Sequence, residues 1–276
     1  MDDTVGSIWT HWHVHPDALI GLGLLQAVYL VGIGPLRKRY YPSAKARPSQ
    51  TALFTTGITI IFIALISPIH ELSDQYFFSI HMVQHVLLSL VAPPLLILGI
   101  PDWLIRPIIR PNWSFRIVKF SIHPLIAFTS FNVVFSLWHL PVLYNLSVTN
   151  HGIHIGEHLM FMSTSIIMWM PIASTIPELP RLSYPFRMVY LFLLSIAQII
   201  VFAPITFSKE PLYQFYVMAP RIWNVSPITD QQIGGIIMKV GSGVLFLALF
   251  IVVFFKWFNT EKENNAITQT NKENLW

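Results

Sequence analysis

Two pairs of histidines in this sequence have the spacing of metal ligands: His81 with His85, and His154 with His158. In an α-helix, residues four positions apart lie on one face, with their Cβ atoms about 5–6 Å apart. Two imidazoles placed in this way can hold one metal ion, and imidazole suits zinc, copper, iron and nickel. His139 closes a further apolar segment. We therefore predict a metal site that these five histidines share.

The neighbouring residues decide which metal the site is predicted to hold. Met82 adjoins the first histidine pair, and the chain contains no cysteine. Thioether sulfur selects Cu(I), whereas the absence of thiolates removes iron–sulfur clusters and thiolate metal sites. We therefore predict copper, in the Cu(I) state, with His139 or Met82 assisting the two histidine pairs. Haem iron, held axially by two histidines on facing helices, is the alternative.

The helices that carry these residues are predicted to lie in a membrane. Hydrophobic residues make up 54% of the 276 residues and charged residues only 11%, against about 25% in soluble domains. A membrane-spanning helix needs about 20 mostly apolar residues, and seven segments meet that requirement. They are residues 17–35, 50–68, 77–98, 122–140, 153–173, 187–205 and 234–257. The predicted fold is all-α, a polytopic bundle of seven transmembrane helices.

The distribution of Lys and Arg orients this predicted bundle. Of the 17 such residues, 14 fall in the first, third and fifth connections and at the C-terminal end. Because cytoplasmic segments are enriched in Lys and Arg, we predict a cytoplasmic C-terminus and an N-terminus outside. Residues 1–16 then form an outer arm, 17–258 the membrane domain and 259–276 a disordered cytoplasmic tail. The topology explains the positive net charge, so we predict contact with the lipid bilayer and not with nucleic acid.

With this orientation, every histidine except His123 falls on the outer side. The two histidine pairs and His139 lie at one depth, just inside the outer face. Polar groups within hydrocarbon are costly and usually functional, so this clustering is the main indication of function. The arm adds His11, His13 and His15, which we interpret either as a site that captures metal or as a solvated segment.

One motif suggests an enzyme instead. His154, Glu157 and His158 match H-x-x-E-H, in which two histidines bind zinc and the glutamate is the general base of a hydrolase. The match is short, and no acidic third ligand follows it in a suitable context. Walker, Rossmann and G-x-S-x-G motifs are absent. We predict that the chain is not an enzyme, with a zinc-dependent membrane hydrolase as the alternative.

Four motifs in order give the sequence a family resemblance. HMVQH at 81–85, WHLPVLY at 138–144, HIGEHLMF at 154–161 and DQQIGGIIM at 230–238 resemble the CtaG-type cytochrome c oxidase assembly factors of bacteria. The resemblance implies a multi-pass protein of the bacterial plasma membrane that helps to assemble a haem–copper oxidase of the caa3 type. It also implies copper delivery, with oxidase subunits as partners, and leaves the copper donor unidentified. Lys239 follows the last motif, where many members have Trp.

Overall fold

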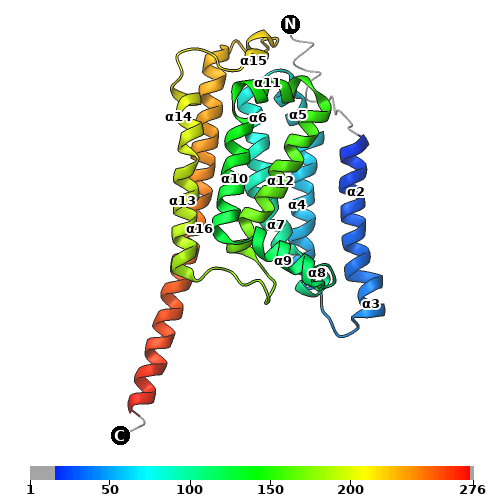
Figure 1. Cartoon of the computed structure of the whole chain (residues 1–276), viewed down its shortest axis with the longest axis vertical. Helices are drawn as coiled ribbons and strands as arrows, with labels where there is room; N and C mark the ends of the chain where they lie inside the picture. Colours follow the sequence, from blue (N-terminus) through cyan, green and yellow to red (C-terminus); the bar gives the residue numbers. More distant parts are fainter. Residues whose placement is uncertain (1–15, 274–276) are drawn as a thin grey trace.

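The computed structural model describes residues 16–273, and the side chains of residues 16–270 (Figure 1). Every regular element among the described residues is helical. The elements are α2 (Pro16–Val31), η1 (Gly32–Leu36), α3 (Arg37–Tyr40), α4 (Pro48–Ile66), α5 (Pro68–Gln75), α6 (Phe78–Val86), η2 (Leu87–Val91), α7 (Ala92–Gly99), α8 (Asp102–Ile109), α9 (Asn112–Ser121), α10 (Pro124–Trp138), α11 (Pro141–Thr149), α12 (His151–Ala173), α13 (Tyr184–Ala197), α14 (Ile199–Phe207), α15 (Gln214–Met218) and α16 (Pro227–Glu273). The predicted arm histidines, His11, His13 and His15, lie outside the described residues.

Five helical stretches among the described residues are long and apolar enough to cross a membrane. They are Pro16–Tyr40, Pro48–Ile66, Phe78–Gly99, Tyr184–Phe207 and Pro227–Thr270, and α9 with α10 would add a sixth as a pair bent by 66°. The predicted all-α class is confirmed, and five of the predicted spans overlap these stretches. α12 also has the length of a span, at 23 residues. It is not one of the five stretches, and it carries the polar second histidine pair. The count of seven spans and the orientation of the termini therefore stay predictions.

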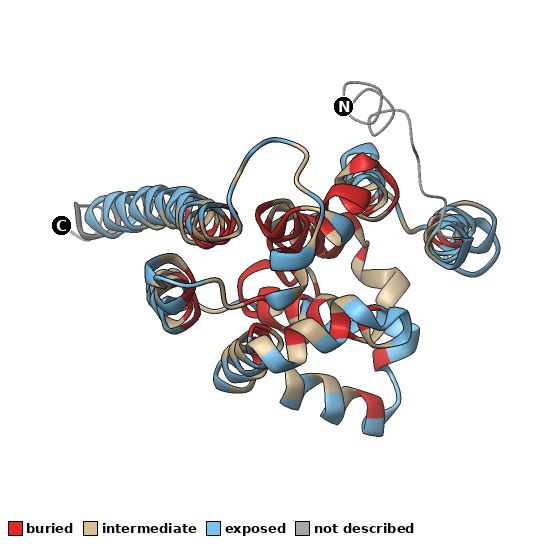
Figure 2. Ribbon diagram, turned by 90° about the horizontal axis from the view of Figure 1, so that it is seen from above, coloured by how far each residue is buried: buried red, intermediate tan, exposed pale blue. Residues whose placement is uncertain are grey.

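The centre of the bundle is where its buried residues concentrate (Figures 1 and 2). There α12 packs against α10 and α7, while α16 packs against α6, α13 and α14. At the periphery, α2 packs against α4 and leaves most of its apolar side chains exposed, as with Ile20 at 67%. An apolar outer surface of this kind suits hydrocarbon as the surrounding solvent.

A π-helical turn, η2, interrupts the third predicted span just after His85. Pro93 and Pro94 follow in the first turn of α7, and proline has no N–H to donate to the carbonyl four residues earlier. The carbonyl of Ser89, four residues before Pro93, instead accepts a 3.1 Å hydrogen bond from the indole of Trp169. The helices that carry the two histidine pairs are therefore joined by a hydrogen bond beside the irregular turn.

The C-terminal segment differs from its prediction. Residues 259–276 are predicted to be a disordered tail, but α16 continues as a helix to Glu273, so that prediction is wrong for residues 259–273. The segment contains no Gly or Pro and several good helix formers such as Glu261, Lys262 and Ala266. Extending an existing helix needs no new nucleation, so a polar continuation of an apolar span stays helical.

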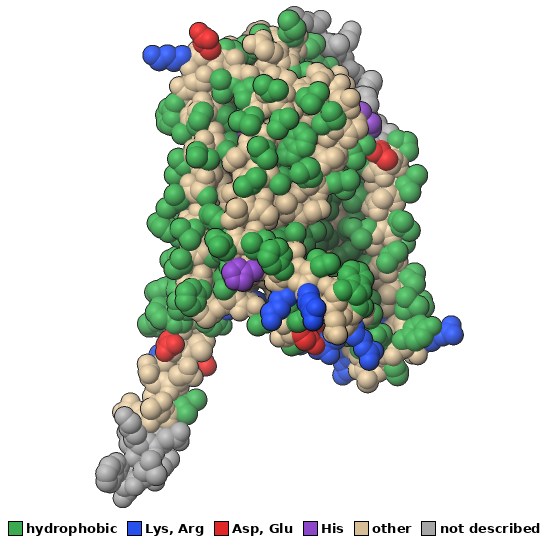
Figure 3. Space-filling model, viewed as in Figure 1, with side chains coloured by type: hydrophobic (Ala, Val, Ile, Leu, Met, Phe, Trp, Pro, Cys, Tyr) green, Lys and Arg blue, Asp and Glu red, His purple; other side chains and the backbone are tan. Residues whose placement is uncertain are grey.

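The two ends of the bundle differ in charge. On the face shown in Figure 3, most Lys and Arg side chains gather at the end formed by α3, α8 and α9. α8 carries Arg106, which pairs with Asp102 at 3.2 Å and with Glu178 at 3.5 Å. The helices α5, α11 and α15 form the opposite end (Figure 1). α6 begins at that opposite end, so the histidine pair that it carries lies away from the basic end.

Candidate metal centre

A residue far along the chain fixes the start of α6, which carries the first histidine pair. The Asp230 carboxylate of α16 accepts hydrogen bonds from the backbone N–H groups of Phe78, at 2.8 Å, and Ser79, at 3.1 Å. These N–H groups have no partner within their own helix, and a carboxylate at a helix N-terminus is stabilising. Gly234 allows the close approach, because a Cβ atom there would lie 2.4 Å from the Phe78 ring. Asp230 and Gly234 thus position α6.

His81 and His85 are buried on one face of α6. Their ring centroids are 4.5 Å apart, and the side chain of His81 has no exposed surface. Among the described residues, neither histidine has a hydrogen-bond partner for either ring nitrogen. Buried polar atoms are nearly always hydrogen-bonded in proteins. These unpartnered imidazole nitrogens therefore indicate a place for a ligand.

α12 brings the second histidine pair against the first. The rings of His154 and His158 are 4.4 Å apart. His154 lies 5.6 Å from His81, and His158 lies 5.7 Å from His85, measured between ring centroids. The side chain of Asn150 caps α12 by accepting a hydrogen bond from a backbone N–H of its first turn. The two predicted pairs, from separate helices, therefore form one cluster.

His139 joins this cluster, whereas Met82 lies in the hydrophobic core. The His139 ring at the end of α10 is 5.8 Å from that of His85. Its Nδ1 lies 2.7 Å from the carbonyl oxygen of Phe135, which fixes the ring and leaves Nε2 without a partner in the described chain. The side chain of Met82 packs towards α16. Its Cγ lies 3.2 Å from the point that a Cβ atom would occupy if Gly234 had a side chain. The structure thus brings the five predicted histidines together.

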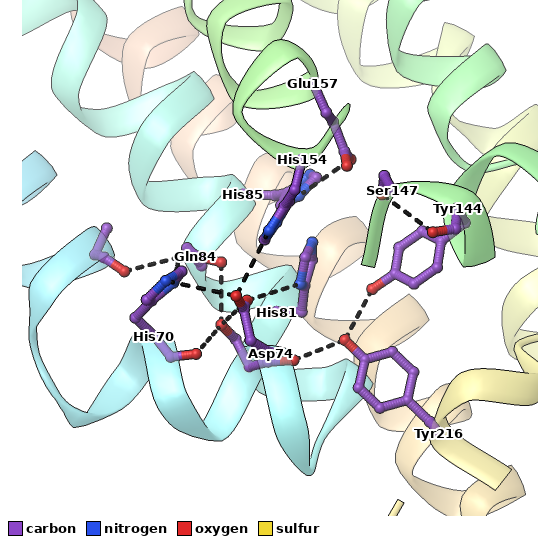
Figure 4. Close-up of polar contacts among 12 residues, drawn as sticks. His70, Asp74, His81, Gln84, His85, Tyr144, Ser147, His154, Glu157 and Tyr216 are labelled. Atoms are coloured by element: carbon purple, nitrogen blue, oxygen red, sulfur yellow. Dashed lines mark hydrogen bonds and ion pairs between the residues drawn. The ribbon is translucent and has the colours of Figure 1, made fainter. Parts of the chain in front are cut away.

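Two carboxylates complete the centre (Figure 4). Asp74, on α5, lies 4.0 Å from His81 Nδ1 and 3.5 Å from His154 Nδ1. Glu157, fully buried on α12, lies 3.7 Å from His85 Nε2. Two groups of candidate ligands result, Asp74–His81–His154 and His81–His85–Glu157, and the ligand atoms of each lie within 4.8 Å of one another. Each group offers two imidazoles and one carboxylate, a set suited to a divalent metal ion.

A hydrogen-bond network holds Asp74 in position. Ser73 Oγ donates to the His70 carbonyl at 2.6 Å and lies 3.1 Å from Asp74 Oδ1. His70 Nε2 is 3.5 Å from Asp74 Oδ2. The Gln84 side-chain amide lies 2.9 Å from His70 Nδ1 and donates to the Ala64 carbonyl at 2.8 Å. Burial raises the pKa of the Asp74 carboxyl to about 7, and the Ser73 hydrogen bond opposes that rise.

A pair of tyrosines borders the cluster on the side of α11 and α15. The hydroxyl groups of Tyr144 and Tyr216 are 3.1 Å apart, and Tyr216 donates to the Ser73 carbonyl at 2.7 Å. The Tyr144 ring centroid is 5.4 Å from that of His81. These contacts attach α5, and with it Asp74, to α11 and α15.

Asp74 and His70 escape prediction from the sequence, although a usable signal is present. They are four residues apart, the same spacing as the two histidine pairs. Extending the search from His–His pairs to His–Asp pairs would have found them. Glu157 is predicted only as the general base of the alternative hydrolase. In the structure its ion-pair contact is with His85 of a different helix, so a ligand role fits its position.

The haem alternative stays a prediction. Axial ligation needs two imidazoles that each point a ring nitrogen at one iron atom from opposite faces of a porphyrin. The rings of His81 and His158 have centroids 6.2 Å apart and planes inclined by 21°. The rings of His85 and His154 both lie within 5.7 Å of these two, so the four imidazoles form one compact group.

Comparison with known proteins adds the family context. The family model described as cytochrome c oxidase caa3 assembly factor matches residues 27–260. Two uncharacterised proteins, Mb0105 of Mycobacterium bovis and MT0111 of Mycobacterium tuberculosis, are each 25% identical over 278 residues, covering 94% of this chain and 41% of theirs. The chain therefore spans about two fifths of the length of these curated relatives. No solved structure matches it.

Proposed function

Because the chain belongs to the family of cytochrome c oxidase caa3 assembly factors, we propose that it carries copper to an oxidase of this type in a bacterial plasma membrane. Copper is the cargo, and oxidase subunits are the partners that receive it. The observation that carries the proposal is the environment of His81. This side chain is fully buried, its two ring nitrogens have no hydrogen-bond partner among the described residues, and two candidate carboxylate ligands lie nearby.

The ligand set suits a metal that must be bound and then released. Imidazole and carboxylate are ligands for Cu(II), whereas thiolates, which hold copper harder, are absent because the chain has no cysteine. Two carboxylates beside the histidines favour Cu(II) over the Cu(I) expected from Met82. The role is that of a carrier, in which ligands are exchanged and no substrate is chemically converted.

Zinc suits the same ligands by charge and ligand type. We propose copper because the family is one of assembly factors for a cytochrome c oxidase, which is a copper-containing enzyme. In a zinc hydrolase, Glu157 would act as the general base beside His154 and His158, the two histidines of its own helix. The 3.7 Å contact of Glu157 with His85, on a different helix, instead supports a ligand role. Metal analysis of the purified full chain, with copper and zinc measured together, separates the two metals.

We propose that the cluster faces the outer side of the membrane. The basic end formed by α3, α8 and α9 is then cytoplasmic, as the positive-inside rule requires. A reporter enzyme that works only outside the cytoplasm should be active when fused after Asn150, at the start of α12, and silent when fused after Trp276. The reverse pattern would place the cluster in the cytoplasm and contradict delivery from the outer side.

Assembly of the oxidase tests the proposed function directly. In cells that carry His85→Ala, the caa3-type oxidase should lose copper and most of its activity, while the variant protein still accumulates in the membrane. Accumulation is expected because the change removes a polar side chain from a buried, apolar span. Oxidase copper content and spectrum are the measurements.

His123→Ala is the matched control for that experiment. His123 is exposed and precedes α10 on the side away from the cluster. Oxidase assembly should therefore be intact in this variant. Normal assembly in His85→Ala cells, or an equal defect in both variants, would contradict the proposed function.

A further inference from the structure

We propose that the centre holds its ion at two successive positions that share His81: an outer position of Asp74, His81 and His154, and an inner position of His81, His85 and Glu157. This inference rests on the proposed function and specifies how the cargo moves. The two groups of candidate ligands overlap only at His81. In Figure 4, Asp74 and Glu157 lie on opposite sides of the histidine rings.

Exposure sets the order of the two positions. The Asp74 side chain is 27% exposed, whereas Glu157 is fully buried and the His85 side chain is only 4% exposed. Asp74 also belongs to the short helix α5, at the end of the bundle where α6 begins. His85 lies one helical turn further along α6 than His81, which is about 6 Å along the helix axis. An ion arriving from solvent therefore meets Asp74 first and reaches Glu157 second.

Transfer between the positions conserves the ligand set. The bonds to Asp74 and His154 break, bonds to His85 and Glu157 form, and His81 stays bound through the same ring nitrogen. Each position has two neutral imidazoles and one carboxylate, so the ion keeps its oxidation state and its total ligand charge. Because the donor types match, neither position should trap the ion strongly relative to the other. No electron or proton has to leave with the ion.

The two positions differ in how their ligands are held. His85, which belongs to the inner position alone, has no hydrogen-bond partner for either ring nitrogen among the described residues. Asp74, by contrast, is held by Ser73, and its oxygens lie 3.5 Å from both His70 and His154. A carboxylate fixed in this way on the more exposed side suits the capture of an ion from solvent.

The test compares copper loading by the full-length protein with and without each carboxylate. Purified chains in detergent are mixed with buffered Cu(II), and copper per chain is measured against time and at saturation. Asp74→Asn should reach the copper content of the wild-type protein but load at least about tenfold more slowly, the lower range for loss of a group that supports a metal ligand. In a Glu157→Gln chain, which retains only the outer position, the additional change Asp74→Asn should remove the remaining copper.

Asp102→Asn, on the opposite end of the bundle, controls for a general effect of charge. Loading of Asp74→Asn at the wild-type rate would overturn the inference. Complete loss of copper from Asp74→Asn alone would also overturn it, because Asp74 would then belong to a single site. Either result leaves the proposed function standing as long as the wild-type chain binds copper. A wild-type chain that binds none would remove the proposed function itself.

Discussion

Replacement of His81 by Ala should lower copper binding more than any other single substitution in the cluster. His81 is the one residue common to both groups of candidate ligands, so its loss leaves each with one imidazole and one carboxylate. Removing a direct ligand should exceed the 10–100-fold reduction in affinity that is typical when only a supporting residue is lost. We expect close to zero copper per chain after buffer exchange, measured by elemental analysis.

The variant should remain folded, which makes this result interpretable. His81 makes no hydrogen bond to a described residue through its ring, so the substitution breaks none and leaves a small cavity. Thermal unfolding in detergent and the amount of protein in the membrane report on folding. His123→Ala, at an exposed position, should retain the wild-type copper content. Full copper binding by His81→Ala would refute both positions at once.

Glu157→Gln should change metal affinity and metal-free stability in opposite directions. Gln keeps the shape of the side chain and removes its charge, so copper affinity should fall by roughly 10–100-fold or more. In the absence of metal, a buried carboxylate is costly to keep charged, and its replacement by a neutral amide should leave the protein as stable or more stable. Copper titration and thermal unfolding of metal-free protein measure the two effects.

Glu178→Gln is the control for this substitution, because Glu178 is exposed and pairs with Arg106 at the basic end. Neither copper affinity nor unfolding temperature should change there. A Glu157→Gln chain that binds copper as tightly as the wild-type would exclude the carboxylate as a ligand. A hydrolytic activity lost in that chain, with zinc retained, would instead favour the enzyme alternative.

The histidine cluster was predictable because helix periodicity is a local property. His81 with His85, and His154 with His158, need only a helix to share a face. Membrane depth then placed both pairs at one level. The spacing of His70 and Asp74 is an equally local signal, but the place of Asp74 beside the cluster was not predictable from it, because Asp74 lies in a short helix between spans. Only the fold shows that α5 lies against the start of α6 (Figure 4).

Other differences between the sequence predictions and the structure have equally specific causes. Met82 is adjacent to His81 in the chain, but neighbouring residues in a helix point about 100° apart, so Met82 faces α16. Asp230 accepts a hydrogen bond from the backbone N–H of Phe78, 152 residues away in the chain. No local sequence pattern indicates such a contact. The helical continuation beyond Asn259 was missed because a polar composition was read as disorder, although it lacks helix breakers.

α16 forms a single long helical rod. Its 47 residues extend over about 70 Å at 1.5 Å per residue, more than twice the roughly 30 Å of hydrocarbon in a bilayer. One end of this rod holds Asp230, which caps the helix that carries His81. The other end projects well clear of the bundle (Figure 1). A single uninterrupted helix therefore connects the residue that caps α6, the helix of the first histidine pair, to a point well beyond the rest of the bundle.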